Sequence, residues 1–463
     1  MSATFESSAN TAGSNLAGRR AGEGPPYAVI VGLGRTGLSC ARYLAAQGWR
    51  LAVTDTRAAP PELTKLAALD ARIPVRCGGL DPGLLDGALC VVASPGVALS
   101  EPFFVEARRR GLSIVGDIEL FARAAQAPVA GITGTNGKST VTTLLARMAQ
   151  RAGVSVRAGG NLGEPALELL AAAPALYVLE LSSFQLETTT SLECRAATVL
   201  NVSPDHLDRY ASVSEYARAK ARIFARCDTA VINLDDPLVV AMPRAARRTL
   251  SFSLRFGAGA DYAVATSAGE RWLSRAGTPL LPVAALKVKG LHNAANALAS
   301  LALGEALGVP LPAMLAELAE FAGLPHRAQW VREARGVTYI NDSKGTNVGA
   351  TLAAVVGLPG PLVMIAGGDG KNQDFAPLAA AFRGKVRHAV LIGRDAPLLA
   401  HALAGVCTLE TCGSLPEAVR AAARAARPGD TVLLSPACAS FDMFRDYTQR
   451  GAVFAQAVAE LTA

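Results

Sequence analysis

The sequence predicts an α/β protein of three domains, with a Rossmann-like domain at each end and a P-loop ATPase-type, mostly parallel sheet between them. Two glycine-rich loops, at 32–37 and 131–137, each follow a short apolar run and precede a helical pattern, which is typical of nucleotide-binding α/β units. In the last third of the chain, apolar runs alternate with alanine-rich stretches, which indicates a second doubly wound sheet. The length of 463 residues accommodates three domains of roughly 150 residues each.

Composition supports a globular chain and argues against several other classes. Apolar residues make up 51% of the chain, charged residues 18%, and the net charge is +7. This balance suits anionic substrates, whereas a nucleic-acid-binding protein would show a basic patch interleaved with aromatic residues. The eight cysteines are scattered without a C-x-x-C pair, which favours reduced, buried thiols in a cytoplasm. With no uncharged apolar span of about 18 residues, we expect no membrane segment.

The first domain is expected after a polar N-terminal tail. Residues 1–25 are rich in Ser, Ala, Gly and Asn and lack the apolar core of a signal peptide, so we expect them to be disordered. A strand at 28–31 then leads into the first glycine-rich loop and a helix, and a second strand ends at Asp55, where a ribose hydroxyl would sit. A third apolar run ends in Ser94-Pro95-Gly96, which is either an ordinary turn or a ligand-binding loop.

The second glycine-rich loop indicates ATP. Its backbone N–H groups, the Lys138 ammonium and the following helix N-terminus would cradle polyphosphate, and the Ser139 hydroxyl would reach Mg²⁺. The first glycine of the usual pattern is due at Ile132, so the match is imperfect, but the flanking strand and helix favour the ATP site. Because a P-loop beside a second nucleotide domain suits a nucleotide-linked substrate, the pair indicates ATP-driven group transfer or bond formation.

Three further residues of the central domain are candidates for the chemistry. Glu180 ends a buried strand at 176–180, as a Walker-B acid does, and His206 follows the next strand beside Asp205 and Asp208, which favours a functional histidine. Lys220 lies on the apolar face of a helical pattern over 214–227 that also carries Tyr216, Ile223, Phe224 and Cys227. Its stem either carries the ammonium out to solvent or points into the active site, as a phosphate counter-ion or as a metal-binding carbamate.

The third domain presents polar loops at strand ends. Its expected strands are 337–340, 361–366, 388–392 and 431–434. Three of them run into N-D-S-K-G-T-N, G-G-D-G-K and S-P-A-C-A-S, which carry Lys344, Thr346, Lys371 and Ser440. Ammonium and hydroxyl groups in this arrangement suit an acidic amino acid with two carboxylates.

From about Tyr27 to the C-terminus, the chain resembles the Mur ligases of peptidoglycan synthesis, and within that family the branch that adds D-glutamate. The segments that carry the resemblance include V-G-L-G-R-T-G-L-S, G-I-T-G-T-N-G-K-S-T-V-T-T-L, L-E-L-S-S-F-Q-L-E, D-H-L-D-R-Y, L-P-H-R, N-D-S-K-G-T-N and L-L-S-P-A-C-A-S-F-D. The family has its own form of the P-loop, G-T-N-G-K-S/T, which accounts for the misplaced glycine. The resemblance implies that ATP drives the ligation of D-glutamate to UDP-N-acetylmuramoyl-L-alanine through an acyl phosphate.

The resemblance also implies a domain division and a role for each loop. The domains would be 26–117 for the UDP-linked substrate, 118–323 for ATP, and 324–463 for the amino acid. The residues implied for the UDP-linked substrate are Gly34, Arg35, Thr36, Asp55, Thr56, Arg57, Ser94, Pro95, Gly96 and Asn161. Those implied for ATP are Gly134, Thr135, Asn136, Gly137, Lys138, Ser139, Thr140, Asn293, Asn296, Arg327, Asp342 and Thr346. Those implied for D-glutamate are Lys344, Thr346, Lys371, Ser440, Phe441 and Tyr447, the last a phenylalanine in the best-known members.

The same resemblance implies two Mg²⁺ ions and a catalytic set of Lys138, Glu180, His206 and Lys220. One ion would be bound by Ser139 and Glu180, and the other by His206 with Lys220 as a carbamate. The family further implies a cytoplasmic monomer. Three alternatives stay open at this point: another amino-acid ligase of the superfamily, an NAD-dependent oxidoreductase built on residues 32–55, and a non-catalytic nucleotide-binding regulator.

Overall fold

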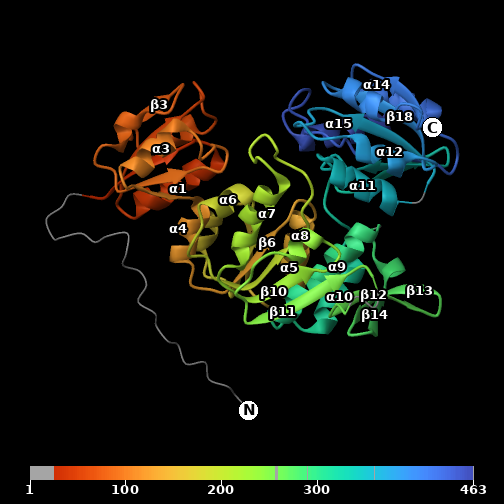
Figure 1. Cartoon of the computed structure of the whole chain (residues 1–463), viewed down its shortest axis with the longest axis horizontal. Helices are drawn as coiled ribbons and strands as arrows, with labels where there is room; N and C mark the ends of the chain where they lie inside the picture. Colours follow the sequence, from red (N-terminus) through yellow and green to blue (C-terminus); the bar gives the residue numbers. More distant parts are fainter. Residues whose placement is uncertain (1–24, 256–258, 289, 359, 462–463) are drawn as a thin grey trace, which may run out of the picture. The chain divides into compact units, whose positions relative to one another are not determined.

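The computed structural model describes residues 25–255, 259–288, 290–358 and 360–461, so nearly all of the expected N-terminal tail lies outside the described residues. The chain forms two compact units: the first runs to Gly131 and includes Val156–Arg195, and the second comprises Ile132–Ser155 and the chain from Ala196 onward. Three sheets, most of whose strand pairs are parallel, are joined by helices (Figure 1). The predicted α/β fold class is therefore confirmed.

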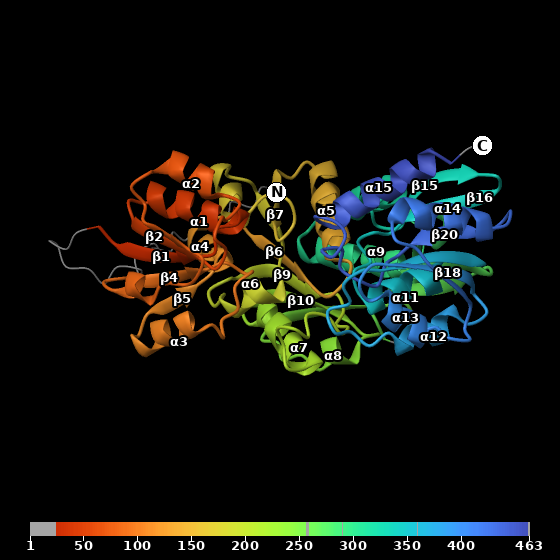
Figure 2. The same ribbon diagram turned by 90° about the horizontal axis from the view of Figure 1, so that it is seen from above.

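The first sheet has five parallel strands in the order β3-β2-β1-β4-β5. The strands are β1 (Tyr27–Val31), β2 (Arg50–Asp55), β3 (Val75–Cys77), β4 (Cys90–Ala93) and β5 (Ser113–Val115). The helices are α1 (Arg35–Ala46), α2 (Leu63–Leu69), α3 (Pro102–Arg109) and α4 (Asp117–Ala124). Val29 and Val91 pack on Phe103 and Phe104 of α3, and α1 and α4 cover the opposite face (Figure 2). Burial on both faces explains why β1 and β4 are uninterrupted apolar runs.

The second sheet has nine strands in the order β14-β13-β12-β11-β10-β9-β6-β8-β7. The strands are β6 (Val129–Thr133), β7 (Val156–Gly160), β8 (Leu176–Glu180), β9 (Cys194–Val199), β10 (Cys227–Asn233), β11 (Arg248–Ser253), β12 (Tyr262–Ser267), β13 (Glu270–Arg275) and β14 (Thr278–Pro282). The helices are α5 (Lys138–Arg151), α6 (Ser183–Glu187), α7 (Val213–Ala221), α8 (Pro237–Val240), α9 (Leu291–Ala306) and α10 (Leu311–Glu320). Strands β12, β13 and β14 pair antiparallel, and α5 packs against α9 and α10.

The third sheet has six strands in the order β15-β16-β20-β17-β18-β19, with only β15 antiparallel. The strands are β15 (Gln329–Ala334), β16 (Val337–Asn341), β17 (Leu362–Gly367), β18 (Val386–Ile392), β19 (Thr408–Thr411) and β20 (Thr431–Leu434). The helices are α11 (Val348–Gly357), α12 (Ala376–Phe382), α13 (Ala396–Ala402), α14 (Leu415–Ala425) and α15 (Tyr447–Ala459). Helices α11, α12 and α13 pack against the sheet to form one hydrophobic core, and α14 and α15 form a second core with it (Figure 2). All four expected strands are present, within two residues of their predicted bounds.

One expected element differs from the structure. The helical pattern over 214–227 ends as an α-helix at Ala221, and a short 3₁₀ turn, Arg222–Phe224, leads to Cys227 at the start of β10. The prediction that Cys227 shares a helical face with Lys220 is therefore wrong, because the β-prone run after Cys227 pairs with β11 instead. Across the described residues, every cysteine is a free thiol, and the helices are too short or too polar to span a membrane.

Candidate active site

The loops at the carboxyl ends of β1, β2 and β4 bring together most residues expected to hold the UDP-linked substrate. Asp55 accepts the Leu33 N–H at 2.6 Å and binds the Arg57 guanidinium at 2.9 and 2.7 Å. Burial acts to raise the pKa of Asp55, but the hydrogen bonds from Arg57 and Leu33 outweigh it and lower the pKa to about 2. Ser94 Oγ donates to the Gly32 carbonyl at 2.8 Å, so the Ser94–Gly96 loop is tied to the glycine-rich loop.

Two predicted residues of the first unit contact each other although they are implied to have different roles. Asn161 Nδ2 donates to Glu180 Oε1 at 2.8 Å, and the Asn161 N–H donates to the Glu180 carbonyl at 2.8 Å. Glu180 ends β8 with only 3% of its surface exposed. Nearby, the Arg35 guanidinium donates to the Gly163 carbonyl at 2.8 Å, which connects the glycine-rich loop to the turn that carries Asn161.

The P-loop runs from β6 to the N-terminus of α5 and depends on the glycine that precedes this helix. Gly137 has φ of 84°, and a Cβ atom at that position would lie 2.4 Å from Asn296 Oδ1, so only glycine fits. The Asn201 side chain accepts the Asn136 N–H at 2.8 Å and donates to its carbonyl at 3.1 Å. These contacts hold the loop against the end of β9. In this position the P-loop presents its backbone N–H groups at the N-terminus of α5.

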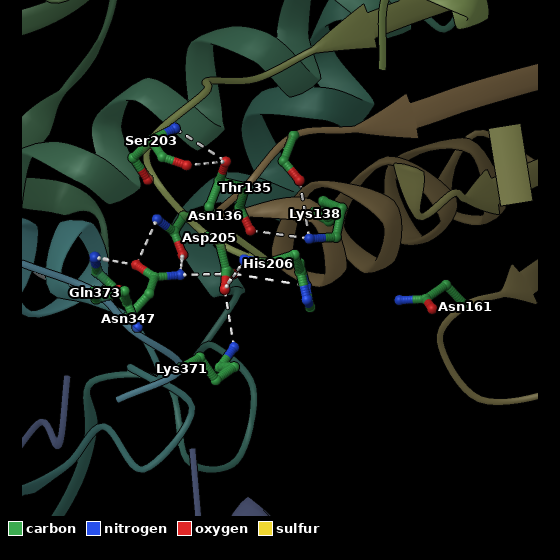
Figure 3. A network of polar contacts seen from close by, with 12 residues as sticks. Thr135, Asn136, Lys138, Asn161, Ser203, Asp205, His206, Asn347, Lys371 and Gln373 are labelled. Carbon is green, nitrogen blue, oxygen red and sulfur yellow. Dashed lines mark hydrogen bonds and ion pairs between the residues drawn. The ribbon is translucent and has the colours of Figure 1, made fainter. Parts of the chain in front are cut away.

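Two lysines converge on the same P-loop carbonyl. Lys138 Nζ donates to the carbonyls of Gly134 and Thr135 at 3.0 and 2.9 Å, and Lys220 Nζ donates to the Gly134 carbonyl at 2.8 Å (Figure 3 shows Lys138). Lys220 is 1% exposed, and its ammonium lies 4.4 Å from the centre of the Tyr216 ring. Of the two alternatives for Lys220, the solvent-directed stem is therefore wrong, and the inward-pointing lysine is what the structure shows.

His206 lies beside these lysines in a strained loop. Its backbone has φ of 55°, and its ring centre is 6.1 Å from that of Tyr216. Burial lowers the pKa of His206 to about 4, against the opposing charge of Asp205. The imidazole is therefore neutral near pH 7, which is the form that binds a metal ion.

A cavity of about 390 Å³ adjoins the P-loop in the second unit. Residues predicted to hold ATP that line it are Asn136, Gly137, Thr140, Asn293, Asn296, Arg327 and Asp342. Arg327 donates to Ser139 Oγ at 2.6 Å, and Asn296 Nδ2 donates to Asn293 Oδ1 at 3.3 Å. Burial raises the pKa of Asp342 to about 6, with hydrogen bonds from Ser435 and the Ala328 N–H opposing it. The structure thus brings seven predicted ATP residues from three separate segments to one cavity, whereas Thr346 is not among its lining residues.

The residues predicted for D-glutamate lie in loops of the third sheet, except Tyr447, which is the first residue of α15. Lys344 Nζ lies 4.1 Å from the centre of the Tyr447 ring, Ser440 is 3% exposed, and Lys371 Nζ donates to Asp205 Oδ1 at 2.8 Å. The side chain of Phe441, in contrast, is 74% exposed. The chain turns after β20, and this turn leaves the Phe441 ring exposed just beyond Ser440. The sequence pattern does not predict the direction of this side chain.

Sequence reasoning gave no role of their own to three residues that organise these loops. Asn347 and Asp205 join the P-loop to Lys371, and Arg450 is fully buried in α15 with its guanidinium donating to Ser343 and to the carbonyls of Cys438 and Ala439. Arg450 was detectable, because it falls four residues before Phe454 on the apolar face of a helix. Asn347 carried no signal beyond closing the N-D-S-K-G-T-N segment.

The candidate metal donors fit Mg²⁺ only with a chemical change. Within the described residues, no three His, Cys, Asp or Glu side chains are grouped so that they could hold a metal ion. An ammonium at Lys220 repels a cation, whereas a carbamate there would supply the oxygen ligands that Mg²⁺ prefers. A neutral His206 and the Ser139 hydroxyl have suitable lone pairs.

Comparisons with known proteins are consistent along the chain. Family models match residues 27–116 (Mur ligase MurD-like, N-terminal domain), 132–304 (Mur ligase middle domain) and 326–438 (Mur ligase, glutamate ligase domain). The chain is 53% identical over 436 residues to a UDP-N-acetylmuramoylalanine–D-glutamate ligase of Nitrosococcus oceani, covering 94% of this chain and 96% of that protein. The ligase of the same name from Pseudomonas aeruginosa is 51% identical, covering 94% of this chain and 98% of that protein.

Solved structures show the same architecture at lower identity. The UDP-N-acetylmuramate-alanine ligase of Thermotoga maritima has a TM-score of 0.60 and 20% identity, covering 94% of this chain and 99% of that chain. A pseudomurein peptide ligase from Methanothermus fervidus has a TM-score of 0.59 and 18% identity, covering 88% of this chain and 96% of that chain. At these identities the likeness establishes a shared fold.

Proposed function

This chain belongs to the Mur ligase family, and we propose that it joins D-glutamate to UDP-N-acetylmuramoyl-L-alanine in peptidoglycan precursor synthesis. It is an ATP-dependent ligase that forms an amide bond and releases ADP and phosphate. The observation that carries the assignment is an identity of 50% or more over 94% of the chain to relatives named as D-glutamate ligases. The P-loop, the two lysines that donate to its Gly134 carbonyl and the adjoining cavity agree with this assignment.

The reaction needs ATP because a carboxylate is a poor electrophile with a poor leaving group. The alanyl carboxylate attacks the γ-phosphate of ATP and becomes an acyl phosphate; the D-glutamate amine then attacks the acyl carbon, and phosphate leaves. The protein contributes mainly position and charge neutralisation. Lys138, held at the N-terminus of α5 by two carbonyls of its own loop, would neutralise the charge that develops on the transferred phosphoryl group.

The family uses ATP together with Mg²⁺, which neutralises phosphoryl oxygens as a Lewis acid when it is bound. We propose two ions here, one held by Ser139 and Glu180 and the other by His206 and a carbamylated Lys220. Carbamate formation would suit Lys220, because it converts a buried cation, 1% exposed, into an anionic ligand beside the neutral imidazole of His206. The Lys220 contact with the Gly134 carbonyl would place that ligand next to the nucleotide loop.

The substrate sites are proposed to follow the three sheets. The loops around Asp55 and Ser94 would hold the UDP moiety, with Asn161 on the muramoyl part, and the cavity lined by Asn293 and Asn296 would hold adenosine. The loops with Lys344, Thr346, Lys371, Ser440 and Phe441, together with Tyr447 at the start of α15, would hold D-glutamate. The proposed domains are 26–117, 118–323 and 324–463, an interpretation supported by the spans of the family models. We further propose a cytoplasmic monomer, which suits a protein with free thiols.

An amino-acid panel read by phosphate release tests the assignment. We expect release to require ATP, UDP-N-acetylmuramoyl-L-alanine and D-glutamate together, with L-glutamate, L-alanine and diaminopimelate inactive. Equal release with any of these amino acids would indicate another ligase of the superfamily. The oxidoreductase alternative is not retained, because the model that matches residues 27–116 is a Mur ligase domain.

A further inference from the structure

Asn347 occupies the junction between the loop of Lys344 and Thr346 and helix α11. Its Oδ1 accepts the Ala350 N–H at 2.8 Å, so it is the N-cap of α11. A cap uses only one oxygen, and serine or aspartate serves equally well in that role. Asn347 is nonetheless 3% exposed, and its Nδ2 group donates two further hydrogen bonds, whereas an aspartate carboxylate donates none and a serine hydroxyl only one.

The Asn347 amide faces the P-loop and a carboxylate at once (Figure 3). Its Nδ2 donates to Asn136 Oδ1 at 3.3 Å and to Asp205 Oδ2 at 3.2 Å, and its Oδ1 accepts from Asn136 Nδ2 at 3.4 Å. These bonds are longer than the usual 2.9–3.0 Å for N–H···O contacts, so a shift of a few tenths of an ångström changes their strength.

Asp205 carries the connection on to Lys371. The Asp205 carboxylate, in a residue that is 7% exposed, accepts from Lys371 Nζ at 2.8 Å and from the His206 N–H at 3.0 Å. The loop of Lys371 is also attached beside Asn347, because Gln373 Oε1 accepts the Val348 N–H at 2.9 Å and Gln373 Nε2 donates to the Gly370 carbonyl at 2.9 Å. A displacement of the Asn136 side chain therefore reaches the Lys371 loop by two routes from the start of α11. One route runs through Asp205, and the other runs through Gln373.

We propose that Asn347 is a positioning residue that couples nucleotide binding at the P-loop to D-glutamate binding at Lys371. The inference rests on the proposed function, in which Asn136 belongs to the ATP site and Lys371 to the D-glutamate site. Asp205 and the amino-acid carboxylate compete for the same ammonium. Nucleotide contacts at Asn136 reorient the Asn347 amide, change its hold on Asp205 and so change how readily Lys371 is released to the amino acid. Such coupling is reciprocal and typically alters affinity by 5- to 150-fold.

Calorimetric titration of D-glutamate into the full chain tests the coupling. UDP-N-acetylmuramoyl-L-alanine is present throughout, and β,γ-imido-ATP, which cannot transfer its phosphate, is present or absent. For the unaltered protein we expect the nucleotide analogue to tighten D-glutamate binding by about tenfold. Asn347→Ser keeps a helix cap but lacks the amide. For this variant, the ratio of D-glutamate affinity with the analogue to that without it should fall to about one. Ser414→Ala, which removes the N-cap of α14 in the same domain, is the matched control and should keep the ratio.

The outcomes separate the two proposals. A ratio unchanged in Asn347→Ser, a ratio lost equally in Ser414→Ala, or no coupling in the unaltered protein overturns the role of Asn347. If thermal unfolding shows that Asn347→Ser is not folded, Asn347→Asp replaces it in the test. Asn347→Asp keeps the cap and places a second carboxylate beside Asp205, and the same loss of coupling is expected. Absence of phosphate release from the unaltered protein with all three substrates would instead overturn the proposed function.

Discussion

The ammonium of Lys220 donates a hydrogen bond of 2.8 Å to the carbonyl of Gly134, 86 residues earlier in the chain. This contact places a fully buried lysine against the turn that begins the P-loop. Because Lys138 donates to the same carbonyl, the two lysines set the local charge where the nucleotide phosphates are proposed to bind. Their replacement gives two separable predictions.

Lys138→Ala should lower phosphate release by about a hundredfold or more. Removal of one preorganised donor from a transition state costs about 10²–10³ in kcat in other enzymes, and Lys138 is proposed to face the transferred phosphoryl group. Steady-state phosphate release with all three substrates measures the change. The exposed Lys65, in α2, supplies the matched control Lys65→Ala, which should keep normal turnover. Near-normal activity of Lys138→Ala would contradict the mechanism.

Lys220→Met should abolish turnover while leaving stability unchanged or raising it. A buried charge replaced by an apolar side chain of similar length often leaves stability neutral or improved, because the desolvation cost disappears. Thermal unfolding and phosphate release of the same preparation give the two readouts. A variant that is as stable as the unaltered protein and fully active would show that neither the Lys220 ammonium nor its carbamate takes part in the reaction.

Asp117→Asn should change the pH dependence of stability. Asp117, in the first turn of α4, is 1% exposed, and burial raises its pKa from 3.8 to about 6, opposed by the hydrogen bond from Gln185. A raised native pKa means that the folded state holds the proton more tightly, so this contribution is present below pH 3.8 and is lost as pH rises through 6. From pH 4 to 7, the unaltered protein should lose up to about 3 kcal/mol relative to Asp117→Asn.

Urea unfolding of both proteins at pH 4, 5, 6 and 7 measures this difference. The amide keeps the size of the carboxyl group and can still accept the hydrogen bond from Gln185, so packing is matched. A constant difference in the free energy of unfolding across the series would contradict the raised pKa of Asp117.

Arg450→Met should weaken D-glutamate binding more than ATP binding. The buried guanidinium donates to Ser343 Oγ at 3.0 Å, to the Ser343 carbonyl at 2.8 Å and to the Cys438 carbonyl at 3.1 Å, so it joins the loops of Lys344 and Ser440. Without it, we expect KM for D-glutamate to rise by about tenfold, as loss of roughly 1.4 kcal/mol would produce, with KM for ATP little changed. Arg420→Met, at an exposed position of α14, is the control; equal rises in both KM values would indicate general loss of structure.

Much of the fold follows from local patterns that the sequence displays directly. Short apolar runs before Asp55, Gly134 and Glu180 predict strands, and the glycines between strand and helix predict phosphate-binding turns. The same local reasoning misplaces Cys227 in a helix, because periodicity cannot tell a buried strand from the end of a helical face. The antiparallel strands β12, β13 and β14 also escape it, because most residues of β13 and β14 are exposed or half-buried and lack the apolar pattern of a core strand.

Local sequence patterns predict the α/β class, the P-loop and the residue types available at each strand end, because glycine conformations, capping and periodicity act over a few residues. Which of those residues meet depends on tertiary packing. It turned Lys220 inward to Gly134 and brought Asn347 to Asp205, 142 residues apart. Such pairs depend on how β9, α7 and α11 pack around the P-loop, and packing is a property of the whole chain that no short segment encodes.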